Sequence, residues 1–232
     1  MTISIGRFET DADIPAGLGS GMAEDTSYRQ RGIYRQGVKR LLDILVVVLA
    51  APFVVPLVAL MALVVAFDGG KPFYTQDRIG KGGRVFRMWK LRSMVVDADA
   101  RMVAHLAANP EARREWDETQ KLRNDPRITR FGQFLRKSSM DELPQLWNVL
   151  TGDMSLVGPR PMMPCQAGLY PSDAYYHLRP GITGYWQTAG RNRTTFAARA
   201  HFDAAYEREL SLATDLAILA RTVQVVLKGT GC

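Results

Sequence analysis

Cysteine and histidine are scarce in this chain of 232 residues, which contains two cysteines, Cys165 and Cys232, and three histidines. Two cysteines cannot form the disulfide framework of a small secreted protein, and the scattered histidines give no metal-binding spacing. The chain also lacks a Walker loop, a Rossmann fingerprint and a GxSxG motif. These absences argue against a P-loop nucleotide-binding protein, a Rossmann dinucleotide-binding protein and a serine hydrolase with a GxSxG motif. The low cysteine content is typical of a reducing cytosol.

Acidic residues are outnumbered by basic ones, 23 against 30, so the net charge is +7. The basic residues gather on both sides of one apolar segment. They are Arg29, Arg31, Arg35, Lys39 and Arg40 before it, and Lys71, Arg78, Lys81, Arg84, Arg87, Lys90 and Arg92 after it. Each such residue gains about 1 kcal/mol near an anionic leaflet. Because no zinc-finger spacing, RNP aromatics or basic heptads are present, we expect anionic phospholipid, and no nucleic acid, as the partner of this charge.

The apolar segment from Ile44 to Phe67 contains no charged residue. It is long enough to span a bilayer, for which roughly 20 apolar residues suffice. Lys and Arg concentrate on the cytoplasmic side of membrane segments, so a straight span would carry one basic flank across against this bias. A re-entrant hairpin keeps both flanks inside, and Pro52 supplies its break because proline lacks the N–H and clashes with the preceding turn.

Two alternatives to the hairpin remain at this point. Proline is tolerated in straight transmembrane helices when neighbouring groups satisfy the freed backbone, and a buried core helix can be equally apolar. We do not expect a cleaved signal peptide, because the apolar run is too long and no clean cleavage site follows it. We therefore divide the chain into a flexible tail (1–30), a re-entrant membrane helix (31–68) and a membrane-associated domain (69–232).

The remainder of the chain predicts helices with a few short strands. Phe73–Gln76 and Val85–Leu91 look like strands around a turn at Gly80–Gly83. Helical patterns cover 97–122, broken at Asn109-Pro110; 129–150, interrupted at Ser138–Ser139; and 202–227, stopped by Gly229. Residues 151–180 are rich in Gly and Pro and predict loops and turns. Several of these helices are amphipathic, which suits either covering a small core or lying in the headgroup plane.

The residues suited to chemistry lie in one dense block from Ser138 to Pro161. Ser139 is placed to cap a helix from Met140, with Glu142 completing a capping box. Adjacent helical residues point about 100° apart, so Asp141 and Glu142 cannot form the paired acids of a glycosidase. They can divide labour, one carboxylate holding Mg²⁺ while the other attacks phosphorus. The simpler interpretation is that both acids cap the helix and compensate its dipole.

Two arginines near these acids are candidates for phosphate binding. Arg136 precedes the acids, and Arg160 is fixed between Pro159 and Pro161. Guanidinium groups bind phosphate oxygens in a bidentate manner. The structural alternative is that Pro-Arg-Pro forms only a corner in the chain.

An ordered set of motifs over residues 39 to about 228 resembles the monotopic phosphoglycosyl transferases, which start glycan assembly on a polyprenol phosphate carrier. The matching segments are Lys39–Asp43 ahead of the run with Pro52, Trp89–Met94, Asp125–Thr129, Asp141–Leu146, Gly152–Pro161, Arg179–Gly184, Trp186-Gln187 and Gly190–Asn192. The resemblance implies an α-rich α+β monotopic membrane protein. Such a protein has a re-entrant helix-break-helix hairpin, interfacial amphipathic helices and a small cytosolic domain with short strands, on the cytoplasmic face of the bacterial inner membrane.

The resemblance also implies a reaction and roles for residues. A UDP-sugar donates its sugar-1-phosphate to undecaprenyl phosphate and UMP is released, in a ping-pong sequence. Asp141 is implied to carry the covalent phosphosugar and Glu142 to hold Mg²⁺. Lys90, Arg136 and Arg160 are implied to contact phosphate. Arg191 and Asp203 are implied to bind the nucleotide.

The chain departs from the family pattern in two respects. Many relatives break the membrane helix at Ser-Pro, whereas Ala51-Pro52 stands here, so no serine hydroxyl is available for the freed carbonyls. Longer relatives add N-terminal membrane spans that this sequence lacks. The chain looks most like the short exopolysaccharide-initiating branch, which uses UDP-galactose or UDP-glucose.

Two further hypotheses from other classes compete with the enzyme. One is a non-catalytic scaffold at the membrane surface, which could lose the Asp141-Glu142 pair that this chain retains. The other is a one-span anchor with a basic face for nucleic acid, for which no reader motif is present. A homo-oligomer is possible, and the sequence indicates no oligomeric state.

Overall fold

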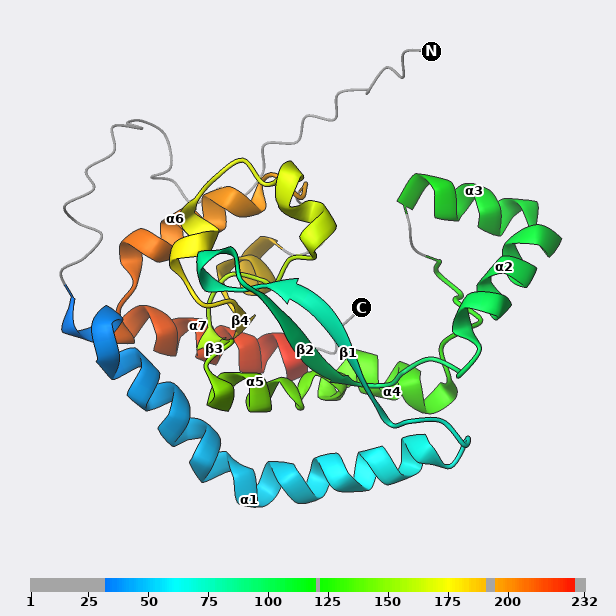
Figure 1. The fold of residues 1–232 in the computed structure, drawn as a ribbon, viewed down its shortest axis with the longest axis horizontal. Coiled ribbons are helices and arrows are strands. Elements are labelled where there is room, and N and C mark those ends of the chain that lie inside the picture. The colour runs from blue at the N-terminus through cyan, green and yellow to red at the C-terminus, as the bar shows by residue number, and fades with distance from the viewer. Residues whose placement is uncertain (1–31, 120–121, 191–194, 228–232) are drawn as a thin grey trace, which may run out of the picture.

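The computed structural model describes residues 32–119, 122–190 and 195–227. The predicted tail (1–30) lies outside the described residues. After one π-helical turn (Tyr34–Val38), helix α1 runs from Lys39 to Ala66. It is the one helix in the described ranges that is long and apolar enough to cross a membrane. The sequence predicted an interruption at Pro52, but the helix continues through Pro52 and Pro56 and bends near its middle (Figure 1). The helix bends instead of ending because proline removes one backbone hydrogen bond, while the neighbouring turns keep their hydrogen bonds.

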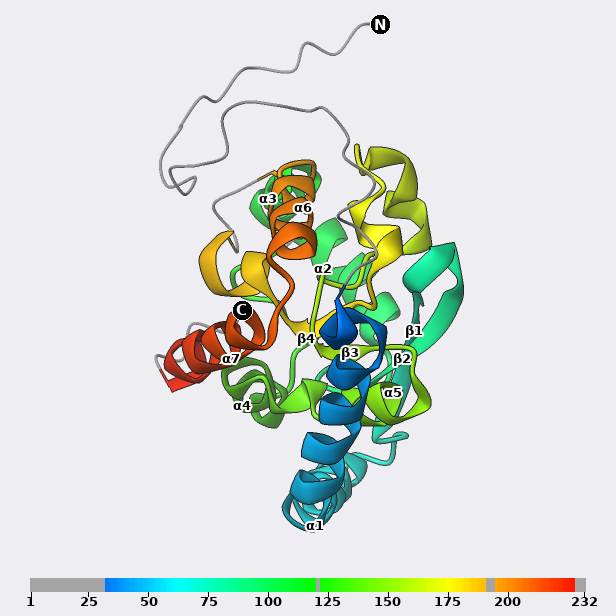
Figure 2. The ribbon, with the colours of Figure 1, turned by 90° about the vertical axis from the view of Figure 1, so that its left-hand side faces the viewer.

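Both ends of α1 pack against the same body of the protein. Val47, near the start, belongs to an apolar cluster with Phe86 and Met88, whereas Met61, near the end, packs with Leu91. The middle of the helix does not pack in this way, since Phe53 is 80% exposed. The bent helix therefore contacts the protein at its two ends and leaves its apolar middle uncovered (Figures 1 and 2).

Polar groups fix the two ends of α1. Near the start, the carboxylate of Asp43 accepts hydrogen bonds from Ser155 Oγ at 2.7 Å and from the backbone N–H of Leu156 at 3.2 Å. Just past the end, Arg92 donates to the carbonyl of Val65 at 2.9 Å and to Asp68 at 2.7 Å. These bonds connect both ends of α1 to residues far away in the sequence.

A buried carboxylate joins the start of α1 to helix α7 (Leu212–Leu227). Asp215 accepts three hydrogen bonds: from Lys39 Nζ at 2.6 Å, from Tyr34 Oη at 2.7 Å and from Tyr206 Oη at 2.6 Å. Asp215 is buried, so these donors replace the water it loses on folding. The carboxylate therefore connects the start of α1, helix α6 (Arg199–Glu209) and helix α7.

Strands β1 (Phe73–Ile79) and β2 (Val85–Leu91) form an antiparallel hairpin. β2 has the predicted bounds, β1 extends beyond the predicted Gln76, and the predicted glycine turn connects them. Gly82 and Gly83 have φ values of 70° and 80°, which glycine adopts without steric cost. Tyr74 pairs with Lys90 and Arg78 with Phe86, so all four side chains share one face of the hairpin.

The helices that follow the hairpin agree with the predicted interruptions. α2 (Ala98–Ala108) and α3 (Pro110–Thr119) meet at Asn109, whose side-chain oxygen accepts from the backbone N–H groups of Glu111 and Ala112, both at 3.1 Å. This helix pair extends away from the body (Figure 1). The predicted segment at 129–150 forms α4 (Arg130–Ser138) and α5 (Gln145–Thr151) with a 3-10 turn between them.

The predicted loop at 151–180 contains more structure than expected. β3 (Ser155–Val157) pairs in parallel with β4 (Gly181–Thr183), and two 3-10 turns lie between them (164–169 and 174–177). The pairing needs glycine, because a Cβ on Gly181 would lie 2.1 Å from the backbone nitrogen of Gly158. The Gly-rich composition thus permits close strand contact here as well as turns.

The last predicted helix is two helices. α6 (Arg199–Glu209) begins before the predicted start at Phe202, and α7 begins at Leu212. Between them, Ser211 accepts a hydrogen bond from the N–H of Thr214 at 3.2 Å, which caps α7. Gly229, the predicted stop, lies outside the described residues. Figures 1 and 2 place α7 on the same side of the body as α4 and α5, above α1.

Candidate active site

The 3-10 turn Met140–Glu142 carries both predicted catalytic acids. The predicted capping box is wrong. Ser139 adopts a left-handed conformation with φ 57°, and its side chain makes no capping hydrogen bond. Its backbone N–H bonds to Arg136 O and Leu135 O, so Ser139 ends α4 instead of starting a helix. Glu142 is therefore free of a capping role, and its carboxylate turns toward strand β2.

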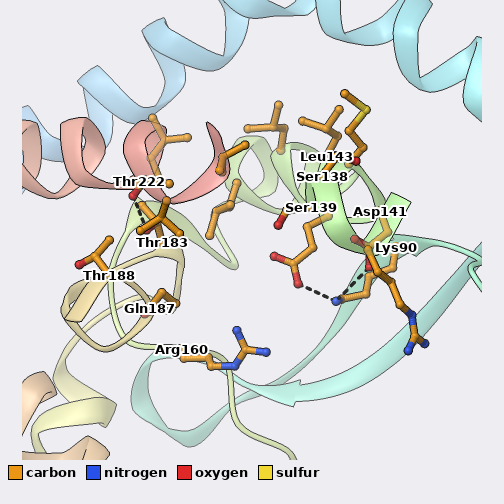
Figure 3. Close-up of a pocket in the computed structure, with 18 of the residues that line it drawn as sticks. Lys90, Ser138, Ser139, Asp141, Leu143, Arg160, Thr183, Gln187, Thr188 and Thr222 are labelled. Atoms are coloured by element: carbon orange, nitrogen blue, oxygen red, sulfur yellow. Dashed lines mark hydrogen bonds and ion pairs between the residues drawn. The ribbon is translucent and has the colours of Figure 1, made fainter. Parts of the chain in front are cut away.

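Lys90 of β2 joins the two carboxylates. Its ammonium lies 2.7 Å from Glu142 Oε1 and 3.7 Å from Asp141 Oδ2 (Figure 3). The rotation of about 100° between adjacent helical residues predicts that the two carboxylates point apart. They nevertheless share one cation, because the ammonium of Lys90 reaches both. All three side chains are largely buried, with Asp141 only 11% exposed. The interaction is therefore stronger than one between surface charges.

The titration of the three groups depends on this contact. Burial alone would lower the pKa of Lys90, but the carboxylates of Glu142 and Asp141 outweigh it and the pKa is raised. Burial alone would raise the pKa of Glu142, but Lys90 and Arg160 outweigh it and the pKa is lowered. For Asp141 burial prevails over Lys90, so its pKa is raised above the ordinary value. The two adjacent acids thus differ in proton affinity, as expected for two acids with different roles.

These groups line a cavity of about 480 Å³. The charged residues of the lining come from β2, α4, the 3-10 turn and the Pro-Arg-Pro corner, and α7, α5, β3 and β4 supply most of its apolar side chains. Its polar lining includes Tyr74, Lys90, Arg136, Ser138, Ser139, Asp141, Glu142, Arg160, Thr183, Gln187, Thr188 and Thr222. Its apolar lining includes Met140, Leu143, Leu146, Leu156, Ile182, Leu219, Val225 and Val226. In the view of Figure 3, Thr222 and Leu143 lie nearer to α1 than Arg160 does.

The structure brings the three cations predicted to bind phosphate into this cavity together with the acids. Arg136 lines it and donates from Nε to Ser93 Oγ at 2.8 Å, which leaves its terminal nitrogens for a ligand. Arg160 is exposed although Pro159 is fully buried, so the Pro-Arg-Pro corner directs the guanidinium outward into the cavity (Figure 3). The guanidinium carbon also lies 5.4 Å from the centre of the Trp186 ring.

Arg78 is a residue of this site that the sequence did not single out. It lies with Lys90, Glu142 and Arg160 around a small recess beside the main cavity. It donates to the carbonyl of Pro161 at 3.1 Å, and burial and Arg160 lower its pKa. The signal was available, because the alternation of strand residues places Arg78 on the same face of the hairpin as Lys90. From the sequence, Arg78 is predicted only to belong to the basic flank that follows the apolar segment.

Of the two residues predicted for the nucleotide, only Asp203 is described by the structure, and it is not in the cavity lining. Arg191 lies outside the described residues. Asp203 is buried on α6, where it accepts a hydrogen bond from Tyr170 Oη at 2.7 Å. Burial raises the pKa of Asp203 to about 7, and the bond from Tyr170 and the charge of Arg199 offset only part of this. Arg199 stacks 4.2 Å from the Trp186 ring, so Asp203 contacts the site through its neighbours.

The donors at the site fit Mg²⁺ only together with a phosphorylated ligand. No group of three or more His, Cys, Asp and Glu side chains in the described ranges could hold a metal ion by itself. Asp141 and Glu142 both line the cavity. Mg²⁺ commonly uses one or two carboxylates and completes its shell with water and substrate phosphates. The carboxylate pair meets this requirement.

Residues 34–229 match the family model described as bacterial sugar transferase. A UDP-galactose-lipid carrier transferase of Erwinia amylovora is 45% identical over 84% of this chain and 41% of its own length. An undecaprenyl-phosphate galactose phosphotransferase of Salmonella typhimurium is 44% identical over 84% of this chain and 41% of its own length.

The exopolysaccharide production protein ExoY of Rhizobium meliloti is 44% identical over 83% of this chain and 87% of its own length. The chain thus spans about two fifths of the first two relatives and most of the third. Because the family model covers α1, the hairpin and the whole acid-containing cavity, the match includes every element of the site described above. The chain belongs to the bacterial sugar transferase family.

Proposed function

We propose that this chain is a phosphoglycosyl transferase that moves a sugar-1-phosphate from a UDP-sugar to undecaprenyl phosphate and releases UMP. The observation that carries the proposal is the pair Asp141 and Glu142 on one ammonium group, inside a cavity with cationic and apolar walls. A scaffold has no need of two buried acids beside Lys90. The names of the related proteins support galactose as the sugar and exopolysaccharide assembly as the pathway. Glucose is the alternative that the motif resemblance implies.

In the first half-reaction, a carboxylate oxygen of Asp141 attacks the sugar-bearing phosphorus of the donor. The bond from this phosphorus to the bridging oxygen breaks, UMP leaves with the bond electrons, and an acyl phosphate joins Asp141 to the sugar phosphate. Arg160 and Arg136 would bind the phosphate oxygens on which charge increases. Lys90 holds the carboxylate of Asp141 in place and favours its ionised form.

In the second half-reaction, a phosphate oxygen of undecaprenyl phosphate attacks the same phosphorus. The acyl phosphate bond breaks, the carboxylate of Asp141 is regenerated, and the product is a sugar attached to the lipid through a diphosphate. Both substrates place negative charge in one cavity in turn, so only cations aimed at the developing charge increase the turnover rate.

Glu142 would hold Mg²⁺ together with oxygens of the donor diphosphate, and the bound ion would neutralise part of the diphosphate charge. The lowered pKa of Glu142 supports this role, because a metal ligand must be deprotonated.

Replacing Glu142 with glutamine should shift the Mg²⁺ dependence of the reaction as well as its rate. The variant loses one charged ligand, so we expect the Mg²⁺ concentration at half-maximal rate to rise about ten-fold or more. A titration of UMP release with Mg²⁺ measures this. Replacing Glu111, an exposed acid on α3, serves as the matched control. An unchanged Mg²⁺ titration in E142Q would remove the ligand role.

We propose that α1 enters and leaves the membrane on the cytoplasmic face of the bacterial inner membrane. The packing of both its ends on one body supports this topology, because a straight span would separate the ends by a bilayer. The basic residues on both flanks support it as well. Residues 31–68 then form the membrane element, and 69–232 form a catalytic domain in contact with anionic phospholipid. Asp43 and Arg92 hold the two together.

Cysteine labelling in intact cells tests this topology. In a chain with Cys165 and Cys232 changed to serine, single cysteines are placed as Gln36→Cys and Lys71→Cys. A reagent confined to the periplasm should label neither, and both should react after the cells are opened. Periplasmic labelling of one position alone means that α1 is a straight span.

The activity itself is tested with the purified chain, Mg²⁺, undecaprenyl phosphate and a panel of UDP-sugars. We expect continuous UMP release and a lipid-linked sugar only when the acceptor and a matching donor, with galactose or glucose, are both present. Absence of lipid-linked product with every donor would overturn the proposal.

A further inference from the structure

Helix α7 carries an apolar stripe that the protein leaves uncovered. Leu212, Leu216, Val223 and Val226 are between 40% and 59% exposed. Spacings of three, four and seven residues place them on one face of the helix, together with the half-buried Leu219. The buried Asp215 and Ile218 lie to one side of this stripe, on the face through which α7 packs on β3 and β4. Apart from Leu219, which also contacts the core, the stripe lies outside the face that stabilises the fold.

One end of this stripe is part of the cavity. Leu219, Val225 and Val226 line the cavity that contains Asp141 and Lys90. Leu156 and Ile182 continue the apolar lining from β3 and β4. We call Leu219, Val225 and Val226 the acceptor wall. A continuous apolar surface thus runs from the outside of α7 into the chamber that contains the two acids.

The cavity has two chemically different sides. Lys90, Arg136 and Arg160 supply positive charge near the acids, and the acceptor wall supplies aliphatic surface. A molecule that matches both sides has an anionic head and a hydrocarbon chain. A nucleoside diphosphate sugar matches only the cationic side, because its other parts are polar. An apolar wall in this position would be of no use to the donor.

We infer that the acceptor wall of α7 binds the hydrocarbon chain of the lipid acceptor next to its phosphate and guides that phosphate to Asp141. The inference rests on the proposed function and assigns this part of the site to one of the two substrates. Helix α7 lies on the side of the body that faces α1, as Figure 1 shows. If α1 lies in the leaflet as proposed, we expect a lipid chain to reach the cavity along the exposed apolar residues of α7.

The test replaces Val226, which is 40% exposed and so can change without opening the core, with glutamine. The control is Leu212→Gln, at the opposite end of the stripe and outside the cavity lining. The acceptor is citronellyl phosphate without vesicles, so that partition into a bilayer does not contribute. We expect the KM for this acceptor to rise about ten-fold in V226Q, the amount expected for loss of one aliphatic contact, and to stay unchanged in L212Q.

The donor half-reaction separates the two substrates. UMP released in a single turnover without acceptor should be the same in V226Q and the unchanged protein. An unchanged acceptor KM in V226Q would overturn the inference. V226Q and L212Q are also assayed with undecaprenyl phosphate in vesicles. If both variants raise the KM for this acceptor equally, and neither changes the KM for citronellyl phosphate, then the stripe only contacts the bilayer.

Photocrosslinking tests the inference without turnover. An isoprenyl phosphate that carries a diazirine in its first isoprene units should label peptides of α7 around 219–226. Labelling confined to other elements would overturn the inference. If the unchanged protein transfers no sugar phosphate but α7 is labelled, then the proposed function fails and the lipid site stands.

Discussion

Replacing Asp141 with asparagine should reduce sugar-phosphate transfer by about 10⁴-fold or more while the protein stays folded. Asparagine has the same shape as aspartate but cannot form the acyl phosphate, so both half-reactions lose their covalent route. Removal of a covalent nucleophile commonly has effects of this size. Transfer to the lipid acceptor measures the loss, and mass spectrometry of the protein after incubation with the donor should find no phosphosugar adduct.

The environment of Asp141 makes this variant informative. Burial raises the pKa of the carboxyl, so a neutral side chain avoids the cost of burying a charge and should not lower the melting temperature. Asp117, exposed on α3 and paired with Arg113, provides the matched control, since D117N removes an acid outside the cavity. Full activity in D141N would end the assignment of Asp141 as nucleophile. An inactive variant with a much lower melting temperature would indicate a structural role instead.

Replacing Lys90 with methionine should lower both activity and stability. The change leaves two buried carboxylates without their shared cation, and breaking a buried ion pair from one side costs about 3–5 kcal/mol. We expect turnover to fall at least about a hundred-fold, because Asp141 loses its positioning and the charge that favours its ionised form. Urea unfolding measures the stability and product formation measures the rate.

The pH dependence gives a second measurement for Lys90. Lys90 lowers the pKa of both Asp141 and Glu142, so its removal should raise both values. The reaction requires ionised carboxylates. On acidification, the variant should therefore lose activity at a higher pH than the unchanged protein does. The double variant K90M/E142Q should recover part of the lost stability, since one of the unpaired charges is gone, but not the activity. An unshifted pH profile would contradict the contact, and K137M, at an exposed lysine of α4, is the control.

Strong local signals made much of the fold predictable. Alternating side chains and a glycine turn predicted β2 and its hairpin, and Asn109-Pro110 predicted the boundary between α2 and α3. The pairing of β3 with β4 was not predictable in this way. Each strand has three residues, too few for a period, and their pairing requires the close approach of Gly158 and Gly181. Ser139 was misread because serine before an acid usually caps a helix, whereas here it follows α4 in a left-handed conformation.

The candidate site was predictable where the motif was contiguous in the sequence. Asp141, Glu142 and the two arginines were identified from neighbouring positions in the sequence, and the family resemblance added Lys90. The contact of one lysine with both acids depends on how β2 packs against the 3-10 turn, which no local pattern contains. The apolar side of α7 was missed as part of the site for the same reason, whereas Arg78 could have been found from the alternation of side chains along β1. The proposed roles of Arg191 and Asp203 in binding the nucleotide stay predictions.

The carboxylate of Asp215 has a mechanical consequence. Its hydrogen bonds from Lys39 and Tyr34 on one side and its place in α7 on the other make a pivot between the membrane segment and a wall of the reaction chamber. If the first half of α1 tilts, it pulls α7 along or breaks bonds at this pivot. If α1 lies in the leaflet as we propose, we expect a change in leaflet thickness to change the width of the opening beside α7.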